Sequence, residues 1–289
     1  MIEEITARVL LSSAKAPDPW FGLKYTMNLY RGCQHQCIYC DSRSECYQIA
    51  NFSDVLVKAN AIELLRRELP RKRVKGTIGT GSMNDPYMSL EAERNLTGRA
   101  LEVIAEYGFP VHVITKSDLV LRDLDTLRQI NQVYAAVSFT ITTADDGLAG
   151  QVEPGAPASS RRFRAMETLA AQGILTGITL MPVLPFIEDT EDNIAAIVQR
   201  AHDSGAGYIL LAFGMTLRDR QRAYYYDQLD RLFPGLRGHY ERRYGERYHC
   251  PVPNAKRLEQ VFQECCAAYG IPTRMRHYAP ATATQLALL

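Results

Sequence analysis

The sequence predicts an α/β fold, a partial (β/α)6 barrel of the TIM type with a C-terminal helical extension. Short apolar runs rich in β-branched residues alternate with longer segments of helical period, which is typical of repeated βα units and a parallel sheet. Six such units follow one another without an antiparallel interruption, whereas a complete (β/α)8 barrel would need two more. We therefore expect an incomplete barrel.

The expected strands lie in one continuous stretch of the chain, and we expect a helix after each of them. They are residues 23–30, 74–80, 111–115, 133–141, 174–181 and 208–213.

Two helices are especially clear in the pattern of apolar residues. After the second strand, five apolar residues share one helical face, and Gly108 then ends the helix. These residues are Leu96, Ala100, Val103, Ile104 and Tyr107. Residues 193–202 repeat this pattern, with acidic residues at the expected N-terminus and Gly205 just beyond the end. Such one-sided helices cover a sheet.

The chain divides into three parts by composition. Residues 1–22 form an N-terminal extension, residues 23–217 the barrel, and residues 218–289 a C-terminal extension with a helical stretch at 254–269. No linker-like or low-complexity tract separates these parts, so we expect the C-terminal extension to pack against the barrel.

The overall charge and the cysteine content narrow the class of protein. The 289 residues carry a formal net charge of +1, which argues against general nucleic-acid binding. No secretory signal or membrane-length apolar stretch is visible, so we expect a cytoplasmic protein without a membrane partner. Of the seven cysteines, three lie within eight residues, which favours metal binding over a disulfide framework.

Cys33, Cys37 and Cys40 directly follow the first expected strand. This position places them at the C-terminal end of the barrel, where active sites of such folds lie. Thiolates suit an iron–sulfur cluster or zinc, and both usually take four protein ligands in structural or electron-transfer sites. Here three are closely spaced, and a cubane cluster held by three cysteines leaves one iron open. A structural zinc site completed by His35 or Cys46 is the alternative.

The cysteine segment resembles the signature of the radical S-adenosylmethionine (SAM) superfamily, C-x3-C-x2-C with an aromatic residue, here Tyr39, before the last cysteine. The nearer resemblance is to the spore photoproduct lyase-like group, often labelled DNA repair photolyases. Its motifs are Asn-Leu-Tyr-Arg-Gly-Cys at 28–33, Asn-Asp-Pro-Tyr at 84–87, Thr-Lys-Ser at 115–117 and Glu-Pro-Gly-Ala-Pro at 153–157. The resemblance implies a 4Fe-4S cluster that binds SAM at its open iron. It also implies reductive cleavage to methionine and a 5′-deoxyadenosyl radical.

Polar residues at the ends of successive strands are the next candidates. The resemblance implies that Asn84, Lys116 and Ser138 contact the methionine part of SAM, and the Lys116 ammonium can pair with its carboxylate. A solvated surface lysine is the alternative. Glu153 and Arg162 flank a Pro- and Gly-rich loop and can bind ribose or substrate, or instead form a salt bridge at a helix start.

One departure from the spore photoproduct lyase pattern concerns the return of a hydrogen atom to the product radical. That enzyme uses a cysteine after the second strand, where this sequence has Ser82. Since an O–H bond is much stronger than an S–H bond, Ser82 argues against thymine-lesion repair. Cys250 is the candidate thiol from elsewhere in the chain, and a structural cysteine is its alternative. Ser82 and Cys250 are therefore the candidate catalytic residues.

The sequence thus predicts a radical SAM enzyme of lyase or oxidoreductase type that abstracts hydrogen from an unidentified substrate. We expect a flavodoxin- or ferredoxin-type reductant as its partner. Arg and Tyr residues interleave over 218–248 and could bind nucleic acid, but intervening acidic residues favour solvated amphipathic helices. The competing functions are DNA lesion repair, non-catalytic electron transfer or sensing by an iron–sulfur protein, and a zinc-stabilised binding module.

Overall fold

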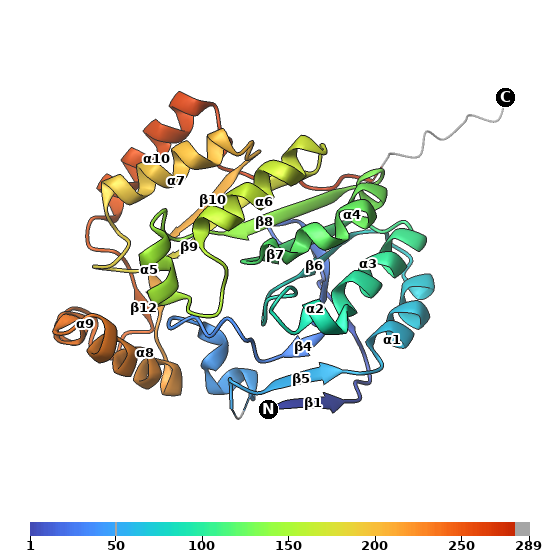
Figure 1. Ribbon diagram of the computed structural model, residues 1–289, viewed down its shortest axis with the longest axis horizontal. Coiled ribbons are helices and arrows are strands. Elements are labelled where there is room, and N and C mark those ends of the chain that lie inside the picture. The colour runs from blue at the N-terminus through green and yellow to red at the C-terminus, as the bar shows by residue number, and fades with distance from the viewer. Residues whose placement is uncertain (50, 281–289) are drawn as a thin grey trace.

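The computed structural model describes residues 1–49 and 51–280. Residues 281–289, the end of the expected C-terminal extension, lie outside the described part. Figure 1 shows a curved sheet with helices packed on its outer side and smaller elements gathered at its edges.

A seven-stranded sheet forms the barrel wall, with the order β10-β9-β8-β7-β6-β3-β2. Neighbouring strands from β3 to β10 pair in parallel, and β2 adds an antiparallel edge. This arrangement confirms the predicted α/β partial barrel of six parallel strands. The strands are β2 (Leu11–Ser13), β3 (Leu23–Met27), β6 (Thr77–Thr80), β7 (Val111–Thr115), β8 (Ala135–Thr140), β9 (Leu175–Val183) and β10 (Ile209–Phe213).

Helices cover the outer face of this sheet (Figure 1). They are α1 (Ala61–Glu68), α3 (Leu96–Glu106), α4 (Leu124–Asn131), α6 (Ser159–Ala171) and α7 (Glu191–Asp203). The predicted apolar stripe of α3 is buried against the sheet, and Gly108 adopts a positive φ of 62° just beyond the end. In α7 the Thr190 side chain accepts a hydrogen bond from the Asn193 backbone and so caps the N-terminus. Both helices confirm the sequence pattern.

The first expected strand is split into two strands with different partners. β3 stays in the barrel, whereas β4 (Tyr30–Arg31) joins a second sheet of order β1-β5-β4. Its other members are β1 (Ile2–Ile5) and β5 (Val55–Lys58). The Lys58 ammonium donates a hydrogen bond to the Asn28 carbonyl oxygen at the break. The chain therefore leaves the barrel directly before the cysteine segment, and the second sheet holds it there.

Short elements complete the loops around the barrel. Four are 3-10 helices, η1 (Asp41–Arg43), η2 (Glu45–Tyr47), η3 (Leu69–Arg71) and η4 (Asp118–Asp123). Two are short α-helices, α2 (Glu91–Arg94) and α5 (Asp146–Val152).

The C-terminal part contains α8 (Asp219–Leu232), α9 (Leu236–Tyr244) and α10 (Ala255–Tyr269), and the small sheet of β11 (Met215–Thr216) and β12 (His249–Cys250). α10 lies along α7 (Figure 1), and α8 packs on η1, which follows the cysteines. After α10 the chain returns to the barrel, where Ile209 donates its backbone N–H to the Pro272 carbonyl. The sheet edge at β10 is therefore covered.

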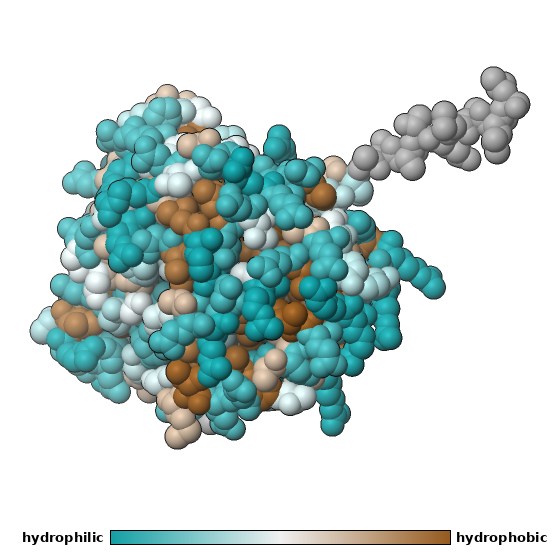
Figure 2. Space-filling view, turned by 45° about the vertical axis from the view of Figure 1, so that its right-hand side comes forward, coloured by the Kyte–Doolittle hydropathy of each residue, from teal (hydrophilic) through white to brown (hydrophobic). Residues whose placement is uncertain are grey.

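The surface does not present one continuous apolar face in the view of Figure 2, where hydrophobic residues form separate patches among hydrophilic ones. Within residues 1–49 and 51–280, no helix is both long and apolar enough to cross a bilayer.

Candidate active site

A cavity of about 520 Å³ opens at the C-terminal ends of the barrel strands. The three cysteines line it together with residues from the loops after β6 and β7, so segments far apart in sequence meet there. Among the lining residues are Cys33, His35, Cys37, Tyr39, Cys40, Ser82, Asn84, Asp85, Thr115 and Lys116. The expected placement of the cysteine segment at this end of the barrel agrees with the structure.

The backbone turns sharply into the cysteine segment at Gly32. Its φ is +80°, and a Cβ there would lie 2.0 Å from the Asp54 carbonyl oxygen, so this position requires glycine. Beyond it, the Gln36 side chain donates a hydrogen bond to the Cys33 carbonyl oxygen and accepts one from Arg43. These contacts fold the segment back on itself, with its thiols toward the cavity.

The thiols of Cys33, Cys37 and Cys40 are free; Cys33 and Cys37 are buried, and Cys40 is half-buried. Burial raises the pKa of the Cys33 thiol to about 12, even though backbone N–H groups of Asp85 and His35 favour its thiolate. Burial also raises the pKa of Cys37 and of Cys40, against the opposing effect of the Lys116 charge. These thiols are therefore protonated in the metal-free chain, and binding of a metal must release protons.

The donor set fits a cluster with one open iron. Three soft sulfur ligands line one cavity, and the other four cysteines of the chain do not line it. In the described part of the chain, no three His, Cys, Asp or Glu side chains converge closely enough to hold a single metal ion. Single-ion convergence is not the geometry that a four-iron cluster requires, since its irons and sulfides separate the cysteine sulfurs.

Lys116 is the cation of this cavity. Its Nζ atom lies 3.8 Å from Glu153 Oε1 and 5.8 Å from the centre of the Tyr39 ring. Burial lowers the pKa of the Lys116 ammonium, but the negative charges of the Cys37 thiolate, when it forms, and of Glu153 outweigh this effect and leave the pKa raised. The alternative of a solvated surface lysine does not fit this placement, because the side chain is only 16% exposed.

Glu153 and Arg162 form a buried ion pair behind the cavity wall. Arg162 Nη1 lies 2.5 Å from Glu153 Oε2, and the guanidinium also donates to the carbonyl oxygens of Thr140 and Pro157. Tyr39 donates its phenolic hydrogen to Glu153. Neither Glu153 nor Arg162 lines the cavity. The structure therefore shows the salt bridge that was the alternative to ribose binding.

Asn84 and Ser82 both reach the cavity but are engaged in other contacts. The Asn84 amide donates to the Tyr30 carbonyl at 2.6 Å, which leaves its side-chain oxygen for a ligand. Ser82 is exposed at the mouth and donates to the Asn28 side-chain oxygen at 3.1 Å.

Ser138 and Cys250 are not brought to the cavity. Ser138 lies within the barrel and is hydrogen-bonded to His112 and Tyr208. On β8 it precedes the cavity-lining Thr140 by two residues. At the rise of a strand, two residues place it about 6.6 Å deeper. Cys250 is buried in an apolar cluster and does not line the cavity, although its strand neighbour His249 and its cross-strand partner Met215 both do.

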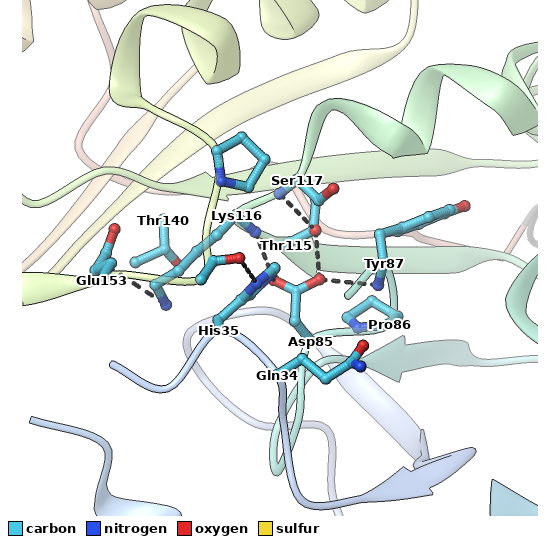
Figure 3. Close-up of polar contacts among 12 residues, drawn as sticks. Gln34, His35, Asp85, Pro86, Tyr87, Thr115, Lys116, Ser117, Thr140 and Glu153 are labelled. Atoms are coloured by element: carbon cyan, nitrogen blue, oxygen red, sulfur yellow. Dashed lines mark hydrogen bonds and ion pairs between the residues drawn. The ribbon is translucent and has the colours of Figure 1, made fainter. Parts of the chain in front are cut away.

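Two residues that the sequence reasoning did not assign to the site join its loops. His35 Nδ1 lies 2.9 Å from the Gly155 carbonyl oxygen, and Nε2 lies 3.2 Å from Asp85 Oδ2 (Figure 3). Burial raises the pKa of Asp85, but the His35 charge and several hydrogen bonds outweigh this and lower it to about 2. Their positions in the sequence could have pointed to them, because Asp85 belongs to the 84–87 motif and His35 to the cysteine segment.

The radical SAM superfamily model matches residues 27–198, which include the three cysteines and the four barrel strands from β6 to β9. The chain belongs to the radical SAM superfamily. Membership implies an enzyme whose cofactors are a 4Fe-4S cluster and SAM.

Several curated proteins are similar in sequence to this chain over two thirds or more of its length. An uncharacterised protein of Mycobacterium tuberculosis is 28% identical over 91% of this chain and 79% of its own length. One of Methanocaldococcus jannaschii is 33% identical over 66% of this chain and 70% of its own. A radical SAM Nalpha-GlyT isomerase of Pseudomonas phage M6 is 25% identical over 72% of this chain but only 41% of its own.

Solved structures support the fold. Spore photoproduct lyase in complex with a dinucleoside spore photoproduct superimposes with a TM-score of 0.69 at 16% identity, over 93% of this chain and 79% of that one. The radical SAM methyltransferase TsrM from Kitasatospora setae gives a TM-score of 0.53 at 13% identity, over 85% and 51%. At these identities the likeness shows the shared barrel alone.

Proposed function

We propose that this radical SAM protein binds a 4Fe-4S cluster through Cys33, Cys37 and Cys40, cleaves SAM reductively and abstracts hydrogen from a substrate. The observation that supports it most is that the three thiols and the Lys116 ammonium open onto one cavity. The sulfurs would hold the cluster, while the cation would hold an anionic group of the cofactor beside it. When bound, the reduced cluster supplies the electron that breaks a C–S bond of SAM and yields methionine and the 5′-deoxyadenosyl radical.

The residues of the chain contribute binding, orientation and shielding. Lys116 would pair with the methionine carboxylate, with Glu153 and the Tyr39 ring limiting where the ammonium can lie. The free oxygen of Asn84 would accept a hydrogen bond from the methionine amino group. The Glu153–Arg162 pair would support Tyr39 from behind without touching the cofactor. Low solvent exposure around the cysteines would exclude water from the reacting atoms.

The electron must come from outside the chain. We propose a flavodoxin- or ferredoxin-type protein as the reductant, because these are the one-electron donors that serve iron–sulfur enzymes of this kind.

Reconstitution with iron and sulfide under anaerobic conditions tests the cofactor assignment. The wild-type chain is expected to turn brown and, after reduction, to give an electron paramagnetic resonance spectrum that changes when SAM is added. A cluster whose spectrum does not change when SAM is added would favour an electron-transfer or sensing protein. A colourless protein that binds zinc would contradict the proposal.

DNA lesion repair is the second candidate substrate class. The fold likeness to spore photoproduct lyase supports it, but the cavity has Ser82 rather than a thiol at its mouth, and Cys250 is buried and does not line the cavity. Turnover of lesion-bearing oligonucleotide by the reconstituted protein would decide for it.

A further inference from the structure

His35 lies between two of the cavity cysteines in sequence, and its side chain has its polar partners in other loops. It is 2% exposed and reaches two other loops, one after β6 and one after α5. Burial of a polar ring without partners is costly. The contacts of the His35 ring with these two loops therefore matter for how the loops are held.

The first contact joins the cysteine segment to the Glu-Pro-Gly-Ala-Pro loop. His35 Nδ1 lies 2.9 Å from the Gly155 carbonyl oxygen, which only accepts hydrogen bonds, so Nδ1 is the donor. Gly155 donates its own N–H back to the His35 carbonyl oxygen at 2.9 Å. A Cβ on Gly155 would lie 2.2 Å from the Gln34 carbonyl oxygen, so the two backbones touch.

The second contact joins the same ring to Asp85. His35 Nε2 lies 3.2 Å from Asp85 Oδ2, close to the carboxylate but outside the geometry of a well-directed hydrogen bond. The same Oδ2 accepts the backbone N–H of Lys116 at 2.6 Å. The other oxygen accepts from the Thr115 hydroxyl at 2.6 Å and from the Tyr87 N–H at 2.9 Å. Asp85 therefore ties His35 to the start of the loop that carries Lys116.

We propose that His35 is a positioning residue that fixes the cysteine segment relative to Lys116 through Asp85 and Gly155. This inference rests on the proposed function in taking the cysteines as cluster ligands and Lys116 as the cofactor's cationic partner. Figure 3 shows the ring between the Asp85 carboxylate and the loop that precedes α6. Partners of this kind orient metal ligands in other proteins and alter affinity without contacting the metal.

The substitutions His35→Asn, His35→Gln and His35→Ala separate the two contacts. An Asn amide can replace Nδ1 toward Gly155, a Gln amide can replace Nε2 toward Asp85, and Ala removes both. The matched control is His112→Ala, since His112 is also buried but lies within the barrel with Ser138. A loss of global stability alone would affect both histidine sites.

The first measurement is amide hydrogen exchange of the full metal-free chain. Exchange over residues 33–40 is expected to rise about fivefold in His35→Ala, and less in the Asn and Gln variants, since a lost hydrogen bond is worth about 1 kcal/mol. His112→Ala is expected to leave this segment at the wild-type rate. Unchanged exchange in His35→Ala, or equal acceleration in the control, would overturn the inference.

The second measurement is SAM binding to the reconstituted chain. His35→Ala is expected to keep its iron but to bind SAM about tenfold more weakly, a loss at the low end of what removal of a positioning partner costs in function, because Asp85 then no longer holds the Lys116 loop against the cysteine segment. Unchanged affinity would overturn the coupling to Lys116. Because the exchange experiment needs no cluster, failure of wild-type protein to cleave SAM would contradict the proposed function and leave the exchange result to be judged separately.

Discussion

The guanidinium of Arg162 lies 2.5 Å from the carboxylate of Glu153, and both side chains are about 1% exposed. Loss of one member of such a pair leaves a buried, uncompensated charge. We predict that Arg162→Met lowers the free energy of unfolding by about 3–5 kcal/mol. The double variant Glu153→Gln/Arg162→Met should lose less, because the buried carboxylate that Arg162 neutralises is removed together with it. Urea unfolding of the metal-free chain measures both, and a double variant less stable than the single one would contradict this.

Lys116→Ala should weaken SAM binding by about 10- to 100-fold, the effect of losing a charge-assisted hydrogen bond. Equilibrium binding to the reconstituted protein checks this. Lys75→Ala is the matched control. Lys75 donates a hydrogen bond to the Tyr107 carbonyl oxygen on the outer surface and does not line the cavity. Equal affinity of the Lys116 variant and the wild type would exclude its role.

Single alanine substitutions of Cys33, Cys37 and Cys40 should each abolish the stable cluster, whereas Cys46→Ala and Cys250→Ala should retain it. The reason is that the first three thiols line the cavity and the other two do not. Iron and sulfide analysis after reconstitution separates the two groups. Loss of iron from Cys46→Ala would point instead to a fourth protein ligand.

The buried Glu188 carboxyl should make the free energy of unfolding of the chain depend on pH. Burial raises the pKa of this carboxyl from 4.5 to about 8, although the Thr142 hydroxyl and the Leu184 N–H favour its charged form. The folded state therefore holds the proton more tightly than the unfolded state. The resulting stability is present in full below pH 4.5 and is lost as the pH rises through 8.

The size of this effect is on the order of a few kcal/mol. Glu188→Gln removes the titration and serves as the reference for all other groups. The difference in unfolding free energy between wild type and this variant should fall across the window from pH 4.5 to about 8. A difference that stays constant there would show that Glu188 is ionised in the folded chain.

The sequence predicted the barrel well because its central strands are buried on both faces. β7 lies at the expected residues, and β8 is buried at every position, which gives the mainly apolar run that the pattern detects. β1 and β2 were not predicted, because they are short and largely exposed, with no apolar periodicity. The break between β3 and β4 depends on pairing with the distant β5, which a local pattern does not show.

The sequence predicted the site residues that lie close together in the chain. It did not predict how deep a side chain lies in the barrel, or which residues from distant loops pair. The spacing of the cysteines is visible in the chain, and they line the cavity. Ser138 has a suitable residue type but lies too deep in the barrel. The pairing of His35 with Asp85 joins residues 50 positions apart in the chain, and only the assembled loops reveal it.

The most direct test of the central claim is the formation of 5′-deoxyadenosine. The anaerobically reconstituted protein is mixed with dithionite and SAM, and the products are separated by chromatography, with the Cys33, Cys37 and Cys40 triple alanine variant as control. The wild type is expected to form 5′-deoxyadenosine and methionine, and the variant neither. A wild-type protein that carries the cluster and forms no 5′-deoxyadenosine would contradict the proposed function.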